Sequence, residues 1–526
     1  MELEAPNAGI TIKLRGAASV DPSTGQISAR FADLPQFPIS NVVVTTNGGP
    51  RAPLANPQRC GEDATVGAAE PWSEMPGESA VTASGDFVIN WNGAGEACPA
   101  VSPFSPSFYA GTTHDLAGAF SPFTFTLKRE DREQNVASIS TTLPEGLLAS
   151  IANVPRCQEP QAASGDCSAN SQVGTTAVGV GSGSEPYYVT GKVYFTGPYN
   201  EAPFGLSVVV PAVAGPFNLG DVVVRVGLSI NPSTAQVTAT SSVFPQIIDG
   251  VPLRIRTVNV TLNAKDLTFN PTSCAQFQIT STVNAAEGAV ANVTSPFAAA
   301  GCKNLPFSPE LSASTEAKST KANGTGLKIK IAYPTGAGQA NIAKVTIDFP
   351  KQLPVRITTI RRACPAATFE ANPAACPVGS NIGTAIVHTP ILGQPLTGPA
   401  YLVSYGNAKW PDVVFVLQGE GVKLDVTGES NVSRSGVLKA SFKSVPDAPF
   451  TSFETTLSRG EYSEFTNVRT TSKAAFSQCG EKLIAPTMIV AQNGRQITQA
   501  TKILVNGCHK QKKKKRHMHG TQRKKK

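Results

Sequence analysis

Residues 231–246 read NPSTAQVTATSSVFPQ, and residues 21–36 carry the same pattern, DPSTGQISARFADLPQ, 210 residues earlier. In both copies an Asp or Asn, a Pro and small hydroxylated residues form a turn signal, which is followed by alternating residues that end at Pro. This pattern predicts a β-hairpin. A calcium loop fits less well, because Asp21 of the first copy is replaced by Asn231 in the second and a calcium site needs several clustered oxygen ligands.

Short β-forming stretches make up most of the chain. Apolar residues account for 40% of the 526 residues, and stretches such as VVVRVGLSI (222–230) and LKIKIAY (327–333) lie between turn-forming Gly, Pro, Asn and Asp. No stretch shows sustained helical periodicity. The sequence therefore predicts an all-β protein.

The cysteines indicate a repeat. Cys98 and Cys302 are 204 residues apart, Cys302 and Cys508 are 206 apart, and Cys274 and Cys479 are 205 apart. A constant period of this kind is typical of tandem units. We therefore expect a unit of about 205 residues, present as two whole copies preceded by half a copy.

Matching stretches place the domain boundaries. QNVASISTTLPEGL at 134–147 matches ANIAKVTIDFPKQL at 340–353. One unit would hold roughly 16 strands, more than a single compact sandwich contains, so each is interpreted as two Ig-like β-sandwich subdomains. The predicted domains are 1–99 (a β-sandwich, the second half of a truncated repeat), 100–218, 219–303, 304–420, 421–508 and a disordered basic tail at 509–526.

The chain opens within a repeat and without the charged and apolar regions of a secretory signal. We expect it to be the C-terminal part of a longer protein.

The cysteine spacing predicts disulfides within pairs. Within-pair bonding is the one connectivity that also suits the half unit. A zinc site fits less well, because the spacings are unlike those of zinc knuckles and no histidine lies nearby. Disulfides in turn indicate an oxidising, extracytoplasmic compartment. The predicted pairs are Cys60–Cys98, Cys157–Cys167, Cys274–Cys302, Cys364–Cys376 and Cys479–Cys508.

The net charge of +8 comes from the C-terminal tail. Residues 509–526 hold ten of the 45 Lys and Arg and none of the 37 Asp and Glu, so the rest of the chain is close to neutral. Such a block can bind anionic polymers, and the absence of interleaved aromatic residues favours cell-envelope polymers over a specific nucleic acid; a merely solubilising tail is the alternative. The tail's basic residues are Lys510, Lys512, Lys513, Lys514, Lys515, Arg516, Arg523, Lys524, Lys525 and Lys526.

No motif marks a catalytic centre. Outside the tail the histidines are His114 and His388, both interpreted as structural. Asp131 and Glu133, within KREDREQN (128–135), are candidate calcium ligands, but the matching stretch of the next repeat has no acids and a solvated turn is favoured. We predict no metal and no cofactor.

Three tryptophans are candidate sugar-stacking residues. Trp72 and Trp91 lie in the loop between Cys60 and Cys98, where a small local core is the favoured interpretation, and Trp410 lies in the last unit.

Several phrases resemble a known family. They are QNVASISTTLPEGLLASIANVPRC (134–157), VGTTAVGVGSGSEPYYVTGKVYFTGPYNEAPFGLSVVVPA (173–212) and NPSTAQVT (231–238). They resemble large exported β-repeat proteins of actinobacteria, over nearly all of residues 6–508. The resemblance implies an exported or surface-attached location. It brings no site residues, because no biochemical activity is known for the family.

The sequence is therefore interpreted as that of a non-enzymatic secreted or cell-surface repeat protein, a structural spacer or adhesion module. Its expected partners are anionic cell-wall polymers or surface glycans, and no membrane-spanning segment is expected. Two alternatives stay open. One is an array of carbohydrate-binding modules, and the other is an envelope hydrolase with a carboxylate pair that carries no sequence signature.

Overall fold

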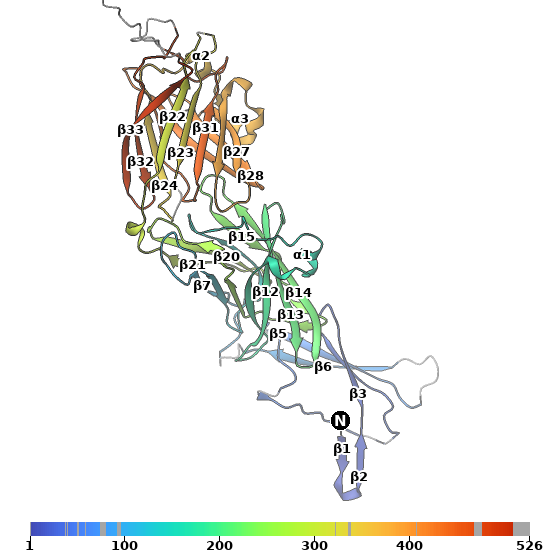
Figure 1. Cartoon of the computed structure of the whole chain (residues 1–526). Coiled ribbons are helices and arrows are strands. Elements are labelled where there is room, and N and C mark those ends of the chain that lie inside the picture. The colour runs from blue at the N-terminus through green and yellow to red at the C-terminus, as the bar shows by residue number, and fades with distance from the viewer. Residues whose placement is uncertain are drawn as a thin grey trace, which may run out of the picture. The chain divides into compact units, whose positions relative to one another are not determined.

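The computed structural model describes residues 2–36, 38, 40–49, 52–57, 59–73, 80–91, 96–320, 322–334, 338–406, 408–467 and 476–508. Strands hold 50% of the residues and helices 6%, so the all-β prediction is confirmed. The chain divides into two compact units (Figure 1). Unit 1 comprises residues 1–231, 236–270 and 274–300, and unit 2 comprises 232–235, 271–273 and 301–526. No helix in the described part of the chain is long and apolar enough to span a membrane.

Unit 1 is built on one sheet of 11 strands, in the order β21-β20-β9-β15-β14-β13-β12-β11-β18-β8-β7. The Ser295 hydroxyl of β21 bridges to β7, where it donates to the carbonyl of Ala110 (3.0 Å) and accepts from its N–H (3.1 Å). The two ends of the sheet therefore meet. The strands are β7 (Ser107–Thr112), β8 (Phe123–Lys128), β9 (Val136–Thr142), β11 (Gln172–Val180), β12 (Tyr187–Thr196), β13 (Phe204–Ala214), β14 (Phe217–Ile230), β15 (Val237–Ser241), β18 (Thr257–Leu262), β20 (Phe277–Ala285) and β21 (Val290–Phe297).

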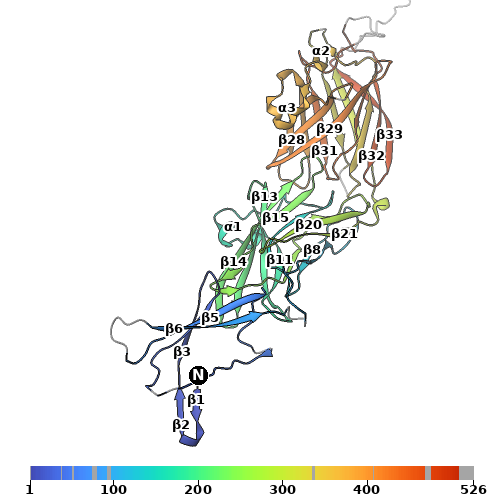
Figure 2. The ribbon, with the colours of Figure 1, turned by 180° about the vertical axis from the view of Figure 1, so that it is seen from behind.

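Unit 2 has a sheet of 12 strands, in the order β25-β27-β26-β31-β23-β22-β33-β32-β24-β30-β29-β28, and an additional pairing of β27 with β28 closes it into a ring. Figure 2 shows β28, β29, β31, β32 and β33 of this sheet from behind. The strands are β22 (Glu310–Glu316), β23 (Leu327–Ala332), β24 (Ile342–Asp348), β25 (Cys364–Pro365), β26 (Asn381–His388), β27 (Leu396–Ser404), β28 (Asp412–Gly419), β29 (Val422–Val432), β30 (Leu438–Phe442), β31 (Ser452–Leu457), β32 (Ile484–Ala491) and β33 (Gln496–Asn506).

The two sheets share one cyclic strand order. Reading round unit 1 from β12 gives β12-β11-β18-β8-β7, then β21-β20-β9-β15-β14-β13, and unit 2 gives β27-β26-β31-β23-β22, then β33-β32-β24-β30-β29-β28. Each strand of unit 1 therefore has a counterpart at the same place in unit 2. The tandem repeat inferred from the cysteine period stays a prediction.

Neither subdomain boundary that the sequence suggested separates two sheets. Residue 219 lies within β14, which pairs with β13 and β15, and residue 420 lies in the turn between the paired strands β28 and β29. Gly215 (φ 56°) and Gly421 (φ 85°) provide the left-handed backbone that such tight turns require. Both positions therefore belong to hairpins inside one sheet.

The described residues within 1–99 form hairpins. β3 (Gly16–Val20) pairs with β4 (Ile27–Phe31), and β5 (Gly61–Ala69) pairs with β6 (Val81–Ile89), each as a separate two-stranded sheet. No described side chain in this range is buried. The sequence suggested a sandwich here, but the structure has separate hairpins. Strand β3 pairs with β4 alone, whereas a strand of the large sheet such as β14 has a partner on both sides.

The turn in the first of these hairpins forms as its sequence predicts. The Asp21 carboxylate accepts hydrogen bonds from the backbone N–H groups of Ser23 (2.9 Å) and Thr24 (2.8 Å) and from both of their hydroxyls. These bonds lower the pKa of Asp21 to about 2. Asp21 thus acts as a turn-forming residue.

Candidate functional site

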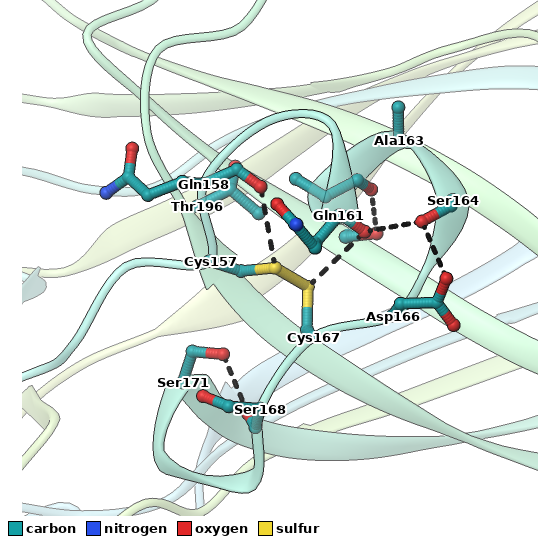
Figure 3. Close-up of a disulfide and its surroundings, with 12 residues drawn as sticks. Cys157, Gln158, Gln161, Ala163, Ser164, Asp166, Cys167, Ser168, Ser171 and Thr196 are labelled. Atoms are coloured by element: carbon teal, nitrogen blue, oxygen red, sulfur yellow. Dashed lines mark hydrogen bonds between the residues drawn. A yellow bond between two sulfur atoms is a disulfide. The ribbon is translucent and has the colours of Figure 1, made fainter.

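A disulfide-closed segment covers the outer face of the sheet in unit 1. Cys157 and Cys167 are bonded (S–S 1.99 Å), and the short helix α1 (Gln161–Ser164) lies between them (Figure 3). The segment is hydrogen-bonded to two strands of the sheet. The Cys157 N–H donates to the Phe195 carbonyl of β12 (2.8 Å), and the Ser207 hydroxyl of β13 donates to the Ala162 carbonyl (2.8 Å). The segment is therefore a cover for β12 and β13.

Unit 2 has a corresponding cover. Cys364 and Cys376 are bonded (S–S 2.00 Å), and α3 (Ala366–Ala371) lies between them. Phe369 of α3 is buried with Cys364 against β27 and β28, and its ring meets that of Tyr401 edge to face at 5.9 Å. The close disulfide of each unit thus fastens a short helical segment onto the equivalent pair of strands.

The disulfide prediction is confirmed. Cys60–Cys98 and Cys479–Cys508 are bonded like the two close pairs. Cys274 and Cys302 are disulfide-bonded as well, and the chain has no free cysteine. Among the described residues no group of three or more His, Cys, Asp and Glu is placed to hold a metal ion.

Within the charged stretch 128–135, where the sequence favoured a solvated turn, Arg129 and Glu133 are buried, whereas Lys128, Glu130 and Arg132 are exposed. Arg129 is 1% exposed, and its guanidinium donates to the carbonyls of Ile255 (2.7 Å) and Glu133 (2.8 Å). The Glu133 carboxylate accepts from the N–H groups of Ser105 (2.8 Å) and Glu130 (3.0 Å). Burial lowers the pKa of Arg129. These carboxylate and guanidinium groups connect loops of unit 1 and are occupied by protein partners.

The other candidate residues lie apart. His114 and His388 are exposed in different units. Trp72 and Trp91 are 65% and 59% exposed, so they do not form the local core that the sequence favoured. Trp410 is half-buried in unit 2. Sugar stacking by these tryptophans stays a prediction, and the basic tail lies outside the described residues.

Unit 2 contains two buried carboxylic acids, Asp447 and Glu464, that the sequence analysis did not single out. Asp447 is 3% exposed and accepts hydrogen bonds from the N–H groups of Thr272 (2.8 Å) and Ser273 (3.1 Å), from the Thr272 hydroxyl (2.6 Å) and from the Asn341 amide (2.8 Å). Burial raises its pKa. Glu464 is 4% exposed, and burial raises its pKa to about 7.

The role of Asp447 could not be predicted from the sequence, because its hydrogen-bond partners are more than 100 positions away along the chain. With four donors directed at it, Asp447 serves to hold residues 271–273 within unit 2. This is a structural role.

Replacing both cysteines of one close pair should destabilise that unit alone. We expect Cys157→Ala/Cys167→Ala to lower the free energy of unfolding of unit 1 by about 3 kcal/mol, because the loop closure is lost from the unfolded chain. The matched variant Cys364→Ala/Cys376→Ala should do the same in unit 2. Hydrogen exchange followed by mass spectrometry separates β12–β14 from β27–β29. Equal loss of protection in both sets for either variant would contradict this assignment.

Unit 2 should lose stability as the pH rises from about 4.5 to about 7. Over this range the unfolded chain releases the Glu464 proton, whereas the folded unit keeps it because of the raised pKa. The loss is on the order of 3 kcal/mol, at 1.36 kcal/mol per pKa unit. Glu464→Gln should flatten this part of the unfolding profile, measured with urea at several pH values, and the exposed Glu310→Gln should leave it unchanged. An unaltered profile in Glu464→Gln would refute the assignment.

Comparison with known proteins gives no family. No family model and no curated protein matches the chain. Among solved structures, the B domain of a biofilm-associated protein aligns with 75% of this chain and 83% of its own at 10% identity, with a TM-score of 0.16. A protein from Corynebacterium diphtheriae described as membrane-anchored aligns with 84% of this chain and 96% of its own at 9% identity, with a TM-score of 0.15. At these TM-scores neither likeness carries an argument about this chain.

Proposed function

We propose that this chain is a non-enzymatic, extracytoplasmic repeat protein that serves as a structural spacer or adhesion module. The observation that carries the proposal is the cysteine usage, because all ten cysteines are disulfide-bonded and the close pairs fasten equivalent covers in units 1 and 2. Structural disulfides persist in oxidising compartments and are rare where glutathione and thioredoxin keep thiols reduced.

The hydrogen bonds of the buried carboxylates Glu133 and Asp447 are consistent with a structural role for these residues. The carboxylates of Glu133 and Asp447 are each occupied by two or more protein donors. A catalytic acid or base instead needs to reach a substrate atom. The resemblance to exported actinobacterial repeat proteins agrees with the same proposal.

The basic tail supplies the proposed attachment. Ten Lys and Arg within residues 509–526 can neutralise phosphates and release their counterions, which makes binding strong at low salt and weak at high salt. The rest of the chain, being close to neutral, adds little to such binding. We propose anionic cell-envelope polymers as the partner.

Protein purified from its native compartment should contain almost no reactive thiol. Alkylation without a reductant should label few of the ten cysteines, and alkylation after reduction should label all of them, because each is disulfide-bonded in the folded chain. Intact-mass measurement counts the labels. Stoichiometric labelling before reduction would exclude an oxidising compartment and the proposed function with it.

Binding to an anionic polymer should depend on the tail. We expect the full chain to bind poly(glycerol phosphate) with an affinity that falls steeply between 50 and 200 mM salt, on the order of 10³-fold or more if the tail makes at least six phosphate contacts. Deletion of 509–526, or replacement of its basic residues by Gln, should abolish this binding. Dextran, which is neutral, is the control polymer. Undiminished binding by the deletion variant would show that the tail is only a solubilising segment.

A further inference from the structure

Unit 1 encloses a cavity within its curled sheet. The cavity has a volume of about 340 Å³ and is lined by the inward-facing side chains of β8, β9, β11, β12, β13, β14, β15 and β18. Several of these strands lie side by side in green in Figure 1. A volume of this size lies within the range of ligand pockets and far exceeds the small voids of ordinary protein cores.

The burial pattern of β13 shows that the interior is not filled by protein. Ser207 and Val209, which point outward under the disulfide-closed cover, are buried. Leu206 and Val208, which line the cavity, are only half-buried, whereas Val210, which also lines it, is buried. In a packed core the inward-facing residues are the more buried ones. The inner face of this strand is therefore accessible from within the cavity at Leu206 and Val208.

Each polar side chain that lines the cavity has a protein partner. The lining is apolar except for five hydroxyl-bearing side chains, and each hydroxyl already has a protein partner. A buried water needs two to four polar partners, so this lining favours hydrocarbon over water or a polar ligand. The five bonds join Thr141 to the Ser281 hydroxyl (3.0 Å), Thr176 to the Asn259 carbonyl (2.7 Å), Tyr187 to the Val213 carbonyl (3.1 Å), Ser241 to the Ile139 N–H (3.0 Å) and Thr268 to the Ser121 carbonyl.

Unit 2 places aromatic rings at the matching positions. On β13, Val208 lies opposite Val193 of β12, and on the counterpart β28, Phe415 lies opposite Ala400 of β27. The offset is 207 residues for both members of the pair. Phe415 thus takes the place of the cavity-lining Val208.

Two further positions show the same exchange. Val258 of β18 pairs with Val178, and its counterpart Phe453 of β31 pairs with Val387. Strands β15 and β30 occupy the same place in the shared strand order. Ser241 is the last residue of β15 and Phe442 is the last residue of β30, so these two residues correspond. All three residues of unit 1 line the cavity.

The three phenylalanines form a cluster in unit 2. The Phe415 ring stacks on Phe442, with centroids 5.7 Å apart, and meets Phe453 edge to face at 5.2 Å. Phe415 is 4% exposed. The same sheet can thus be filled by its own side chains, so two valines and a serine at these positions in unit 1 are not a requirement of the fold.

The cavity has an apolar approach. Tyr187, Val213 and Val251 all line it and are 54%, 40% and 44% exposed. They come from the start of β12, the end of β13 and the short strand β17 (Val251–Pro252). Exposed apolar side chains that continue into an apolar interior are typical of an entrance for an apolar ligand.

We propose that unit 1 binds a single hydrocarbon chain, the acyl chain of a lipid or fatty acid, in this cavity. At about 30 Å³ for each water-sized group, the cavity holds a chain on the order of ten carbons. The chain takes the place that Phe415, Phe442 and Phe453 take in unit 2, and it completes the burial of Leu206 and Val208. This function is additional to the proposed surface role and does not depend on it.

Ligand binding to the full chain tests the proposal. The probe is cis-parinaric acid, a fluorescent fatty acid whose chain is longer than the cavity and would extend through the entrance, with decanoic acid, which matches the cavity in length, as competitor. We expect one binding site per chain, competed by decanoic acid and insensitive to salt. We expect Val258→Phe and the double variant Val208→Phe/Val258→Phe to weaken binding at least tenfold, because the added rings occupy the cavity. Position 258 should accept phenylalanine, because the cross-strand partner there is valine in both units.

Ser229→Phe is the matched control. Ser229 is exposed on β14, outside the cavity, so the same kind of enlargement there should leave binding unchanged. Near-ultraviolet circular dichroism verifies that each variant is folded, and Val258→Phe alone serves if the double variant does not fold. The proposal is overturned if the folded wild-type chain does not bind the probe, or if folded Val258→Phe binds it as tightly as the wild type.

A second arm of the experiment distinguishes the source of the chain. Vesicles of phosphatidylcholine, a zwitterionic lipid without net charge, are used so that the basic tail is not attracted to the membrane surface. One lipid extracted per protein, with extraction lost in Val258→Phe, supports a membrane lipid as the source. Binding of free fatty acid without extraction supports a free acid. Extraction that persists unchanged in Val258→Phe overturns the assignment to this cavity.

Discussion

The hydrogen-bonded strand ladder of each unit, antiparallel except at pairs such as β22 with β33, is the constraint on which the rest of the structure depends. Because neighbouring strands fix one another's register, alternate side chains of every strand must point either into the curled sheet or out of it. In unit 2 the pairing of β27 with β28 closes the ladder, and in unit 1 the Ser295 hydroxyl connects its two ends. The outward face then needs a separate cover, which the disulfide-closed segments provide.

A fixed ladder allows the two interiors to differ without a change of fold. The positions held by Phe415, Phe442 and Phe453 in unit 2 hold Val208, Ser241 and Val258 in unit 1. Because the shared strand order is unchanged, these exchanges alter the filling of the interior and leave the strand pairing as it is. One framework can therefore carry an aromatic cluster in the interior of one unit and an apolar cavity in the other.

Local chemistry made part of this structure predictable. The Asp21 turn and the close disulfides depend on residues near one another in the sequence, so their patterns were sufficient. The division after residue 218 was not predictable, because a succession of short strands does not say whether the next strand returns to the same sheet, as β14 does. The burial of Arg129 and Glu133 within the predicted solvated turn could not be foreseen, because a partner such as Ile255 lies 126 positions from Arg129 in the sequence. The cavity depends on three strands in register, which a single sequence does not reveal.

Crystals of the full chain under xenon pressure test the central claim, that the unit 1 sheet is hollow at the positions where unit 2 is filled. Xenon occupies apolar cavities without needing a polar partner. The account predicts xenon between Val208, Ser241 and Val258 in unit 1, and none between Phe415, Phe442 and Phe453 in unit 2. A chain of ordered waters in the unit 1 interior, or side chains of β13 and β18 in direct contact across it, would contradict it.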